Sequence, residues 1–446
     1  MSHDAQLLLV TLAGVAGLVG LVAGLRLNAF LALALVSLGV GIGAGMTPLA
    51  TAKAFQEGVG STLGLIVVVV GLGTMLGKML SESGGAQVIA DGLTRGLGAK
   101  RLDWAIVLAA FVVGLPVFFA VGLVLLAPLV FTLARGTGQP LLRLAIPLLA
   151  GLSICHTLVP PHPGPVVAVG RLGADMGLTI LLSVAVGLPT ALVTGPCLAR
   201  LLARRMTIPL AGLGAQTATP HTDKRRPGLG ISLVTILMPV GLMLLATIAG
   251  VVLPEAHPRR DAFAFLGTPL VAMLAAVLLS LATFGRRCGF TSAEILKFTE
   301  ECVGPAASIF LVVGAGGGFS KVLDTAGVDD AIAAWGGHLS LSPLILSWLI
   351  GAALRISVGS ATVAITMASA IIAPIAATRP DIRPELLVVA LASGSLALSH
   401  FNDGGFWFVK EYFGLTVAQT FRTWTLMITL ASVFALGLVL ILHTFI

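Results

Sequence analysis

Long apolar runs alternate with short polar segments along almost the whole chain. In the first half the runs cover approximately residues 5–25, 27–46, 60–80, 104–134, 141–158 and 177–203. In the second half they cover approximately 231–253, 264–284, 303–323, 340–377, 385–399 and 416–443. A helix of about 20 apolar residues is long enough to cross a bilayer core. The pattern therefore predicts an all-α polytopic membrane protein, with about 10 full spans plus re-entrant or discontinuous helices.

The composition agrees with this prediction. Hydrophobic residues make up 57% of the chain and charged residues only 10%, whereas soluble domains carry about 25% charged residues. The 4 cysteines are scattered without a CxxC spacing, and the chain contains no HExxH motif. The cysteines therefore say nothing about disulfides, and we expect them to be buried structural thiols, with no metal site.

The two halves of the chain resemble each other. Gly71–Leu80 matches Gly314–Leu323 in its glycine and lysine positions, and His156 corresponds to His400 at a nearly constant offset. We therefore divide the chain into a first repeat (1–205), a solvated linker (206–228) and a second repeat (229–446). An odd number of crossings in each repeat would give the two repeats opposite orientations. Inverted repeats are typical of secondary transporters, whose binding sites lie where broken helices meet.

The basic residues predict the orientation of the chain in the membrane. If the N-terminus lies outside, the inner loops and the linker hold most of the 26 Lys and Arg residues. Only a minority, among them Lys53, Arg171 and Lys321, then fall on the outer side. This is the expected bias toward positive inner loops, and it places both termini outside. The positive charges are spread along the chain rather than gathered in one patch, which excludes a nucleic-acid partner.

Four polar interruptions fall inside apolar runs, two in each half. They are Gly114–Gly122, His156–Pro165, Leu354–Val363 and Ser399–Trp407. Because they occupy corresponding places in the two repeats, they predict a binding site built by discontinuous helices.

The third interruption is rich in small residues and contains a charge. Gly359, Ser360 and Thr362 could form a hairpin tip whose backbone N–H groups bind an anion. The alternative is ordinary close packing of helices through small residues. Arg355 either clamps a substrate carboxylate or forms a structural ion pair with a carboxylate such as Asp403.

The second interruption contains two histidines among prolines. We expect His156, Pro160, His162 and Gly164 to break the helix and line a polar cavity. The alternative is that the histidines are satisfied by packing within the protein. A zinc site is disfavoured, because the prolines disrupt the helix that would align two ligands.

The fourth interruption is the densest polar cluster in an apolar region. It contains Ser399, His400, Asn402 and Asp403, followed by two glycines. Burial makes the carboxyl group of Asp403 a candidate proton carrier. The alternative is that Asp403 caps a helix that begins near Gly405.

These motifs resemble the gluconate permease family, proton-coupled sugar-acid symporters of bacterial inner membranes. The resemblance covers nearly the whole chain and is carried by Gly77–Gln87, Pro160–Pro165, Leu354–Ala364 and Ser399–Trp407. It implies uptake of gluconate or a related hydroxy-monocarboxylate, driven by a proton gradient. It implies no enzyme activity and no cofactor besides the co-transported proton.

The resemblance also implies an architecture and a location. Ties to the wider ion-transporter superfamily imply a homodimer in which a transport domain moves against a scaffold, as in an elevator. The chain is then expected in the lipid bilayer of the bacterial inner membrane, with both termini in the periplasm and the linker in the cytoplasm.

One position departs from the family pattern. The family has a glutamate where Phe118–Gly122 of this chain contains Ala120, a position where a proton carrier would be expected. Either an engineered substitution arrests a coupling step, or this branch couples differently, with Asp403 the next candidate. The alternatives within transport are a D-serine or D-glycerate carrier and a sodium-coupled carboxylate carrier. Outside that class, the alternatives are an anion channel and a membrane-embedded hydrolase that uses His156 and His162.

Overall fold

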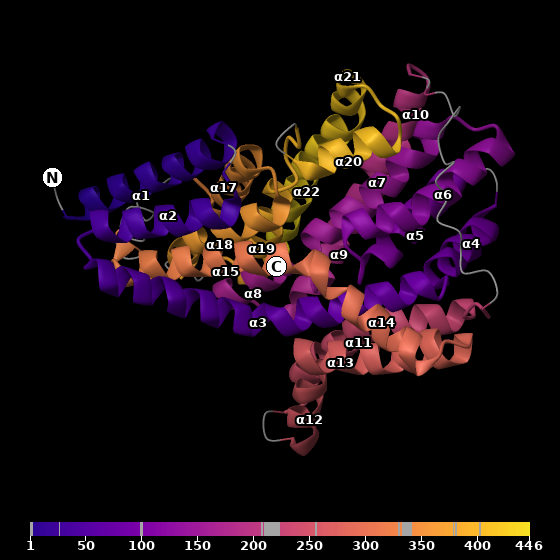
Figure 1. Cartoon of the computed structure of the whole chain (residues 1–446), viewed down its shortest axis with the longest axis horizontal. Helices are drawn as coiled ribbons and strands as arrows, with labels where there is room; N and C mark the ends of the chain where they lie inside the picture. The colour runs from indigo at the N-terminus through magenta and orange to yellow at the C-terminus, as the bar shows by residue number, and fades with distance from the viewer. Residues whose placement is uncertain are drawn as a thin grey trace.

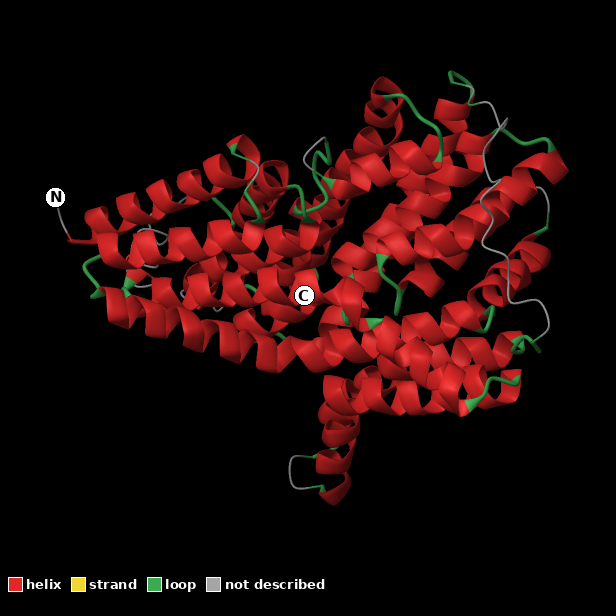
Figure 2. Ribbon diagram, in the orientation of Figure 1, coloured by secondary structure: helices red, strands yellow, loops and turns green. Residues whose placement is uncertain are grey.

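The protein is almost entirely helical. The structure, a computed structural model, describes residues 3–25, 27–98, 101–206, 208, 224–254, 257–328, 331, 341–377, 379, 381–400 and 403–446. Within these ranges the elements are helices joined by short loops, without a β-strand (Figure 2). The all-α prediction is therefore confirmed.

The helices of the first half are α1 (His3–Val19), α2 (Ala29–Gly43), α3 (Pro48–Glu82), α4 (Gly85–Leu97), α5 (Leu102–Gly114), α6 (Phe119–Thr137), α7 (Leu141–Leu158), α8 (Pro163–Leu172), α9 (Met176–Leu192) and α10 (Leu198–Ala203). Those of the second half are α11 (Leu229–Val252), α12 (Pro258–Gly267), α13 (Pro269–Ser280), α14 (Ser292–Glu301), α15 (Val303–Thr325), α17 (Pro343–Val358), α18 (Ala361–Ala377), α19 (Pro384–Gly394), α20 (Gly404–Tyr412), α21 (Val417–Thr420) and α22 (Leu426–His443). Short π or 3-10 segments occur at Gly20–Gly24, Val193–Cys197, Leu281–Gly285, Arg286–Cys288 and Phe421–Thr425.

The helices form an elongated body (Figure 1). One end contains α1, α2 and the start of α3, and the other contains α4, α5 and α6. The short helix α12 projects from the body and has no buried residue. Between the two ends, helices of the two halves of the chain interleave.

Helices break at all four predicted interruptions. The first three breaks lie at 115–118, 159–162 and 359–360, and the fourth lies between the end of α19 at Gly394 and the start of α20 at Gly404. Prolines occur in the first two of these breaks, and proline removes a backbone donor that a continuing helix needs. At the third, Gly359 adopts φ +80° and ends α17, a conformation that glycine reaches without steric cost.

The number of membrane spans is not settled by helix length. Among the described residues, six helical stretches are long and apolar enough to cross a bilayer, and a bent pair within α3 could supply a seventh. Several other expected runs are divided into apolar helices of 10 to 17 residues, including α5, α17 and α18. A multi-pass membrane protein follows from these helices, whereas the expected count of about 10 spans stays a prediction.

Small residues allow the central helices to pack closely. The two repeated segments Gly71–Leu80 and Gly314–Leu323 lie on α3 and α15, which pack along each other. A Cβ atom added to Gly317 would lie only 2.5 Å from the backbone oxygen of Gly58. The α17–α19 contact is tighter still, since a Cβ on Gly394 would lie 2.1 Å from the backbone oxygen of Trp348.

The predicted linker lies largely outside the described residues, which omit 207 and 209–223. Its end is attached to the helical body. Lys224 Nζ donates to the Gly289 backbone oxygen at 2.9 Å and to Glu294 Oε2 at 2.8 Å. Glu294 also accepts from the Thr291 backbone in a capping box, so one carboxylate both caps α14 and anchors the linker.

Candidate functional site

A cavity of about 580 Å³ lies where the broken helices meet. It is lined by Phe118, Phe119, Ala120, Val121, Ser153, His156, Thr157, Arg355, Val358, Gly359, Ser360, Ala361, Thr362, Ser395, Asp403, Gly404, Gly405, Trp424 and Ile428. The first, third and fourth breaks contribute lining residues directly. The second break, at 159–162, is represented by His156, which lies just before it. The structure therefore brings together segments that lie far apart in the sequence.

The α17–α18 turn supplies one wall of the cavity. Gly359 ends α17, and Ser360 precedes the first turn of α18, in which Ala361 and Thr362 line the cavity. The first backbone N–H groups of a helix have no acceptor within it, so they favour a negatively charged ligand. Ser360 Oγ accepts only a long 3.4 Å bond from the Val363 backbone. The turn therefore has the geometry expected for an anion-binding tip.

A second helix N-terminus faces the same cavity. Helix α6 begins at Phe119, and its N-terminal residue Phe118 offers no side-chain cap. Phe119, Ala120 and Val121 of the first turn all line the cavity. The N-termini of α6, which has no side-chain cap, and of α18, which has only the long bond to Ser360, thus supply partial positive charge from two parts of the chain.

Arg355 and Asp403 form a buried ion pair at the edge of the cavity. Arg355 Nη2 donates to Asp403 Oδ2, and Arg355 Nη1 donates to the backbone oxygen of Gly359. Asp403 Oδ1 accepts from the Gly405 backbone at 2.8 Å and caps α20. The alternatives of a structural ion pair and a helix cap therefore both describe Asp403. This pairing leaves the helix N-termini as the uncompensated positive charge.

Ser399 and His400 form hydrogen bonds that stabilise the fourth break, and they lie outside the cavity lining. Ser399 Oγ donates to Asp403 Oδ2 and accepts from Trp424 Nε1 at 2.7 Å. His400 Nε2 lies 3.0 Å from the backbone oxygen of Ile356. Neither residue lines the cavity. Asn402, the remaining member of the predicted cluster, lies outside the described residues.

The histidines of the second break bond to each other. The two Nδ1 atoms lie 3.1 Å apart, and His162 Nε2 lies 2.8 Å from the backbone oxygen of Gly114. Since that oxygen can only accept, His162 carries a hydrogen on Nε2 and, when neutral, accepts at Nδ1. His156 must then donate from Nδ1, which leaves its Nε2 as an unprotonated acceptor. His156 lines the cavity, whereas His162 does not.

Pro160 and Gly164 shape the second break rather than line the cavity. Pro160 lies within the break between α7 and α8. A Cβ on Gly164 would lie 2.9 Å from a methyl carbon of Ile365 and 3.4 Å from Cα of Thr362. Gly164 therefore allows α8 to approach the start of α18.

Several cavity residues are absent from the predicted set. Ser153 and Thr157 share a helix face with His156, and that spacing is a signal from which they could have been found. Trp424 comes from a distant segment, lines the cavity and donates from Nε1 to Ser399 Oγ. In the described part of the chain, no group of three or more His, Cys, Asp or Glu side chains could hold a metal ion.

The chain matches known permeases over nearly its whole length. The profile of the family described as GntP family permease matches residues 6–446. A gluconate permease of Pseudomonas aeruginosa is 45% identical over 99% of this chain and 98% of its own length. The high-affinity gluconate transporter of Escherichia coli is 41% identical, over 96% and 97% of the two chains. The D-serine transporter DsdX of the same species is 38% identical over 92% of both.

Two solved transporters share the fold. The Alcanivorax borkumensis YdaH transporter superposes with a TM-score of 0.61 at 20% identity, covering 88% of each chain. Neisseria gonorrhoeae MtrF, from a class of antimetabolite efflux pumps, gives a TM-score of 0.64 at 16% identity, covering 87% of this chain and 82% of its own. The fold is thus that of a membrane transporter, and the sequence matches show that this chain belongs to the GntP family of permeases.

Proposed function

We propose that this chain is a secondary active transporter that takes up gluconate, or a related sugar acid, together with protons across the bacterial inner membrane. The observation that carries the proposal is the cavity at the N-termini of α6 and α18. The relatives named for gluconate, at 41 to 45% identity, support this substrate class. The relative named for D-serine makes that compound the first competitor to test.

The cavity offers the groups that a hydroxy acid needs. The first turns of α6 and α18 would receive the carboxylate, because the backbone N–H groups at a helix N-terminus favour a negatively charged ligand. Hydroxyls of Ser153, Thr157, Ser360 and Thr362 would receive the substrate hydroxyls. Arg355 would act mainly by holding Asp403 and Gly359 in place, since its guanidinium already bonds both.

The coupling proton needs a carrier other than residue 120. Ala120 has no titratable group, and Asp403 would have to leave its ion pair before accepting a proton. His156 is better placed, because its Nε2 is the unprotonated nitrogen and the residue lines the cavity. The charged groups that share the cavity with it are Arg355 and Asp403. We therefore rank His156 above Asp403 as the coupling residue.

Wider features of the expected mechanism belong to the same proposal. They are inverted repeats at 1–205 and 229–446, an elevator motion, a homodimer and termini in the periplasm. The first repeat breaks at 115–118 and 159–162, and the second breaks at 359–360 and between α19 and α20. This matched pair of breaks in each half supports the repeat assignment.

Uptake by the purified protein in proteoliposomes tests the proposal. Radiolabelled gluconate is offered under an imposed pH gradient, under a sodium gradient, and after a protonophore has collapsed the pH gradient. We expect accumulation above the external concentration only with the pH gradient. L-idonate, for which a 41% identical Escherichia coli relative is named, should compete more strongly than D-serine. Accumulation driven by sodium, or equilibration that ignores both gradients, would contradict proton-coupled transport.

A further inference from the structure

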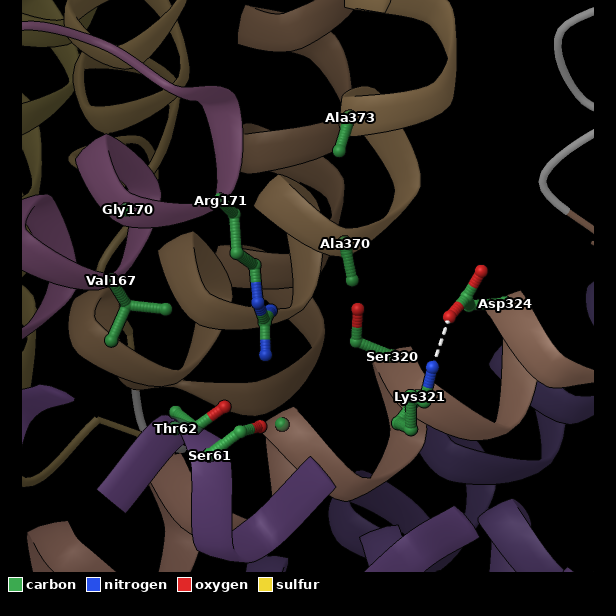
Figure 3. A pocket seen from close by; sticks show the side chains of 11 residues that line it. Ser61, Thr62, Val167, Gly170, Arg171, Ser320, Lys321, Asp324, Ala370 and Ala373 are labelled. Carbon is green, nitrogen blue, oxygen red and sulfur yellow. Dashed lines mark hydrogen bonds and ion pairs between the residues drawn. The ribbon is translucent and has the colours of Figure 1, made fainter. Parts of the chain in front are cut away.

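A second polar cavity, of about 320 Å³, lies between α3, α8, α15 and α18. Its polar lining comes from Ser61, Thr62, Arg171, Ser320, Lys321 and Asp324. It shares no lining residue with the cavity at Ala120 and Arg355. Figure 3 shows Arg171 extending from its helix toward Ser61 and Thr62, with Ser320 beyond it and the Lys321–Asp324 pair farther along the same helix.

Arg171 brings an uncompensated charge to this cavity. Its Nη1 donates to the Thr366 backbone oxygen and, at 3.3 Å, to Ser369 Oγ, both on α18. Its Nη2 is buried without a hydrogen-bond partner in the described part of the chain. A buried cation with an unused donor is costly unless an anion completes its shell.

Two other arginines, Arg355 and Arg200, differ from Arg171 in that each is paired with a carboxylate. Arg355 bonds Asp403, and Arg200 Nε lies 2.7 Å from Asp103 Oδ2. Within the second cavity, Lys321 Nζ lies 2.6 Å from Asp324 Oδ2, so the acidic group there is already neutralised. Among the described residues, no carboxylate lies within ion-pair distance of Arg171. The net charge of the cavity is therefore positive and originates at Arg171.

We propose that the Arg171 cavity is a second binding site for small hydroxy-carboxylates, the substrate class on which the proposed function rests. The guanidinium of Arg171 binds the carboxylate through Nη2, and the hydroxyls of Ser61, Thr62 and Ser320 bind substrate hydroxyls. The unused Nη2 donors of Arg171 can form a charge-assisted hydrogen bond with a carboxylate oxygen.

The position of the cavity makes it a staging site beside the first one. Both cavities border α18. Thr362 lies at its first turn, and Ala370 and Ala373 line the Arg171 cavity. At about 1.5 Å per residue, positions 362 and 370 are about 12 Å apart along the helix. A substrate held at Arg171 would therefore wait within about two turns of the broken-helix cavity.

Protection of introduced cysteines tests the second site. Cys197, the exposed one of the native cysteines, is first replaced by serine. Ser61→Cys then reports the Arg171 cavity and Ser360→Cys reports the first cavity, each through its rate of reaction with a small thiol reagent. Gluconate, uncharged sorbitol and inorganic phosphate are compared as protecting ligands.

We expect gluconate, but not sorbitol, to slow modification of both cysteines. Adding Arg171→Gln should raise the gluconate concentration needed to protect Ser61→Cys by about tenfold or more, since a charged hydrogen bond is lost. Protection of Ser360→Cys should persist in that variant, which also shows that it is folded. Arg171→Lys, which keeps the charge but loses the planar guanidinium that bonds Thr366 and Ser369, should give an intermediate effect.

The possible failures are distinguishable. Protection of Ser360→Cys alone overturns the second site and leaves the proposed function standing. Protection of Ser61→Cys that survives Arg171→Gln overturns the role of Arg171. Protection of Ser61→Cys by phosphate but not gluconate replaces the carboxylate with a phosphate or lipid headgroup. Absence of gluconate protection at both cysteines, together with absence of uptake, overturns the proposed function and the second site with it.

Discussion

The Nδ1 atoms of His156 and His162 lie 3.1 Å apart, and the Gly114 backbone oxygen fixes which of the two donates. The contact therefore determines which ring nitrogen of each histidine in this proline-rich break carries a hydrogen. His162 fixes the tautomer, and His156 presents its unprotonated Nε2 in the cavity that Ala120 also lines.

Replacing His156 by Gln should uncouple transport from the pH gradient. The amide cannot take a proton, so gradient-driven accumulation of gluconate should be lost while exchange of internal for external gluconate continues. Paired accumulation and counterflow assays measure the two activities. His400→Gln is the matched control, because His400 bonds the Ile356 backbone outside the cavity and should stay coupled. Equal pH-driven accumulation by His156→Gln and the unmodified protein would exclude His156.

Introducing a carboxylate by Ala120→Glu should strengthen pH-driven accumulation. Residue 120 lies in the first turn of α6, where a negative charge is favourable, and its side chain would enter the cavity. The steady-state accumulation ratio is compared with that of Ala120→Gln, which has the same size without a titratable group. Identical ratios in the two variants would show that coupling does not pass through this position.

Replacing one member of the Arg355–Asp403 pair should lower the free energy of unfolding more than replacing both members does. Either Arg355→Met or Asp403→Asn leaves a buried partner unpaired, at a cost of about 3–5 kcal/mol. The double variant should lose clearly less stability than the sum of the single losses. Thermal unfolding of the purified variants measures this coupling, and strictly additive losses would show that the pair does not act as a unit.

The contact between Lys224 and Glu294 should hold the linker at neutral pH and release it in acid. The hydrogen bond from Lys224, with those from Thr291, lowers the pKa of Glu294 to about 2. Because the folded pKa lies below the ordinary value of 4.5, the stabilisation is complete above that value and disappears as the pH falls toward 2. Hydrogen exchange of residues 224–228, corrected for intrinsic rates, should accelerate over that range. Glu294→Gln should exchange quickly at neutral pH, and slow exchange there would contradict the anchor.

Gly394→Ala should destabilise the protein by about 1–3 kcal/mol or more, because the added methyl group would meet the Trp348 backbone oxygen at 2.1 Å. Gly437→Ala on α22 is the control, since a Cβ there has no neighbour within 4 Å. The thermal unfolding midpoints of the two variants and the unmodified protein measure this difference in stability. Equal midpoints would mean that α17 and α19 can separate without cost.

The sequence predicts the places where helices break better than the number of spans. Prolines at 116 and 160 and a glycine at 359 interrupt helices through local sterics, which are visible in a single chain. In the sequence, a helix that is broken inside the membrane has the same pattern as one continuous apolar run. The runs 104–134 and 340–377 therefore do not show how many times each segment crosses the membrane. Span counting needs tertiary structure and the bilayer.

Single-residue roles at the site depend on partners that spacing does not reveal. The sequence leaves Asp403 as either a proton carrier or a helix cap, and the bonds to Arg355 and Gly405 show the cap and the ion pair. From its position after an apolar run, the sequence predicts that Arg171 is a charged residue in a loop on the outer side of the membrane. In the structure it bonds Thr366 and Ser369, a contact between distant segments that no local pattern predicts.

Helix α18 has one further consequence, which concerns cooperativity. Its first turn lines one cavity, and its middle turns line the other. A ligand that shifts this helix changes both sets of contacts at once, and thermodynamic linkage requires each site to alter the affinity of the other by the same factor. The substrate would then act as its own effector, and uptake would depart from simple saturation as its concentration rises.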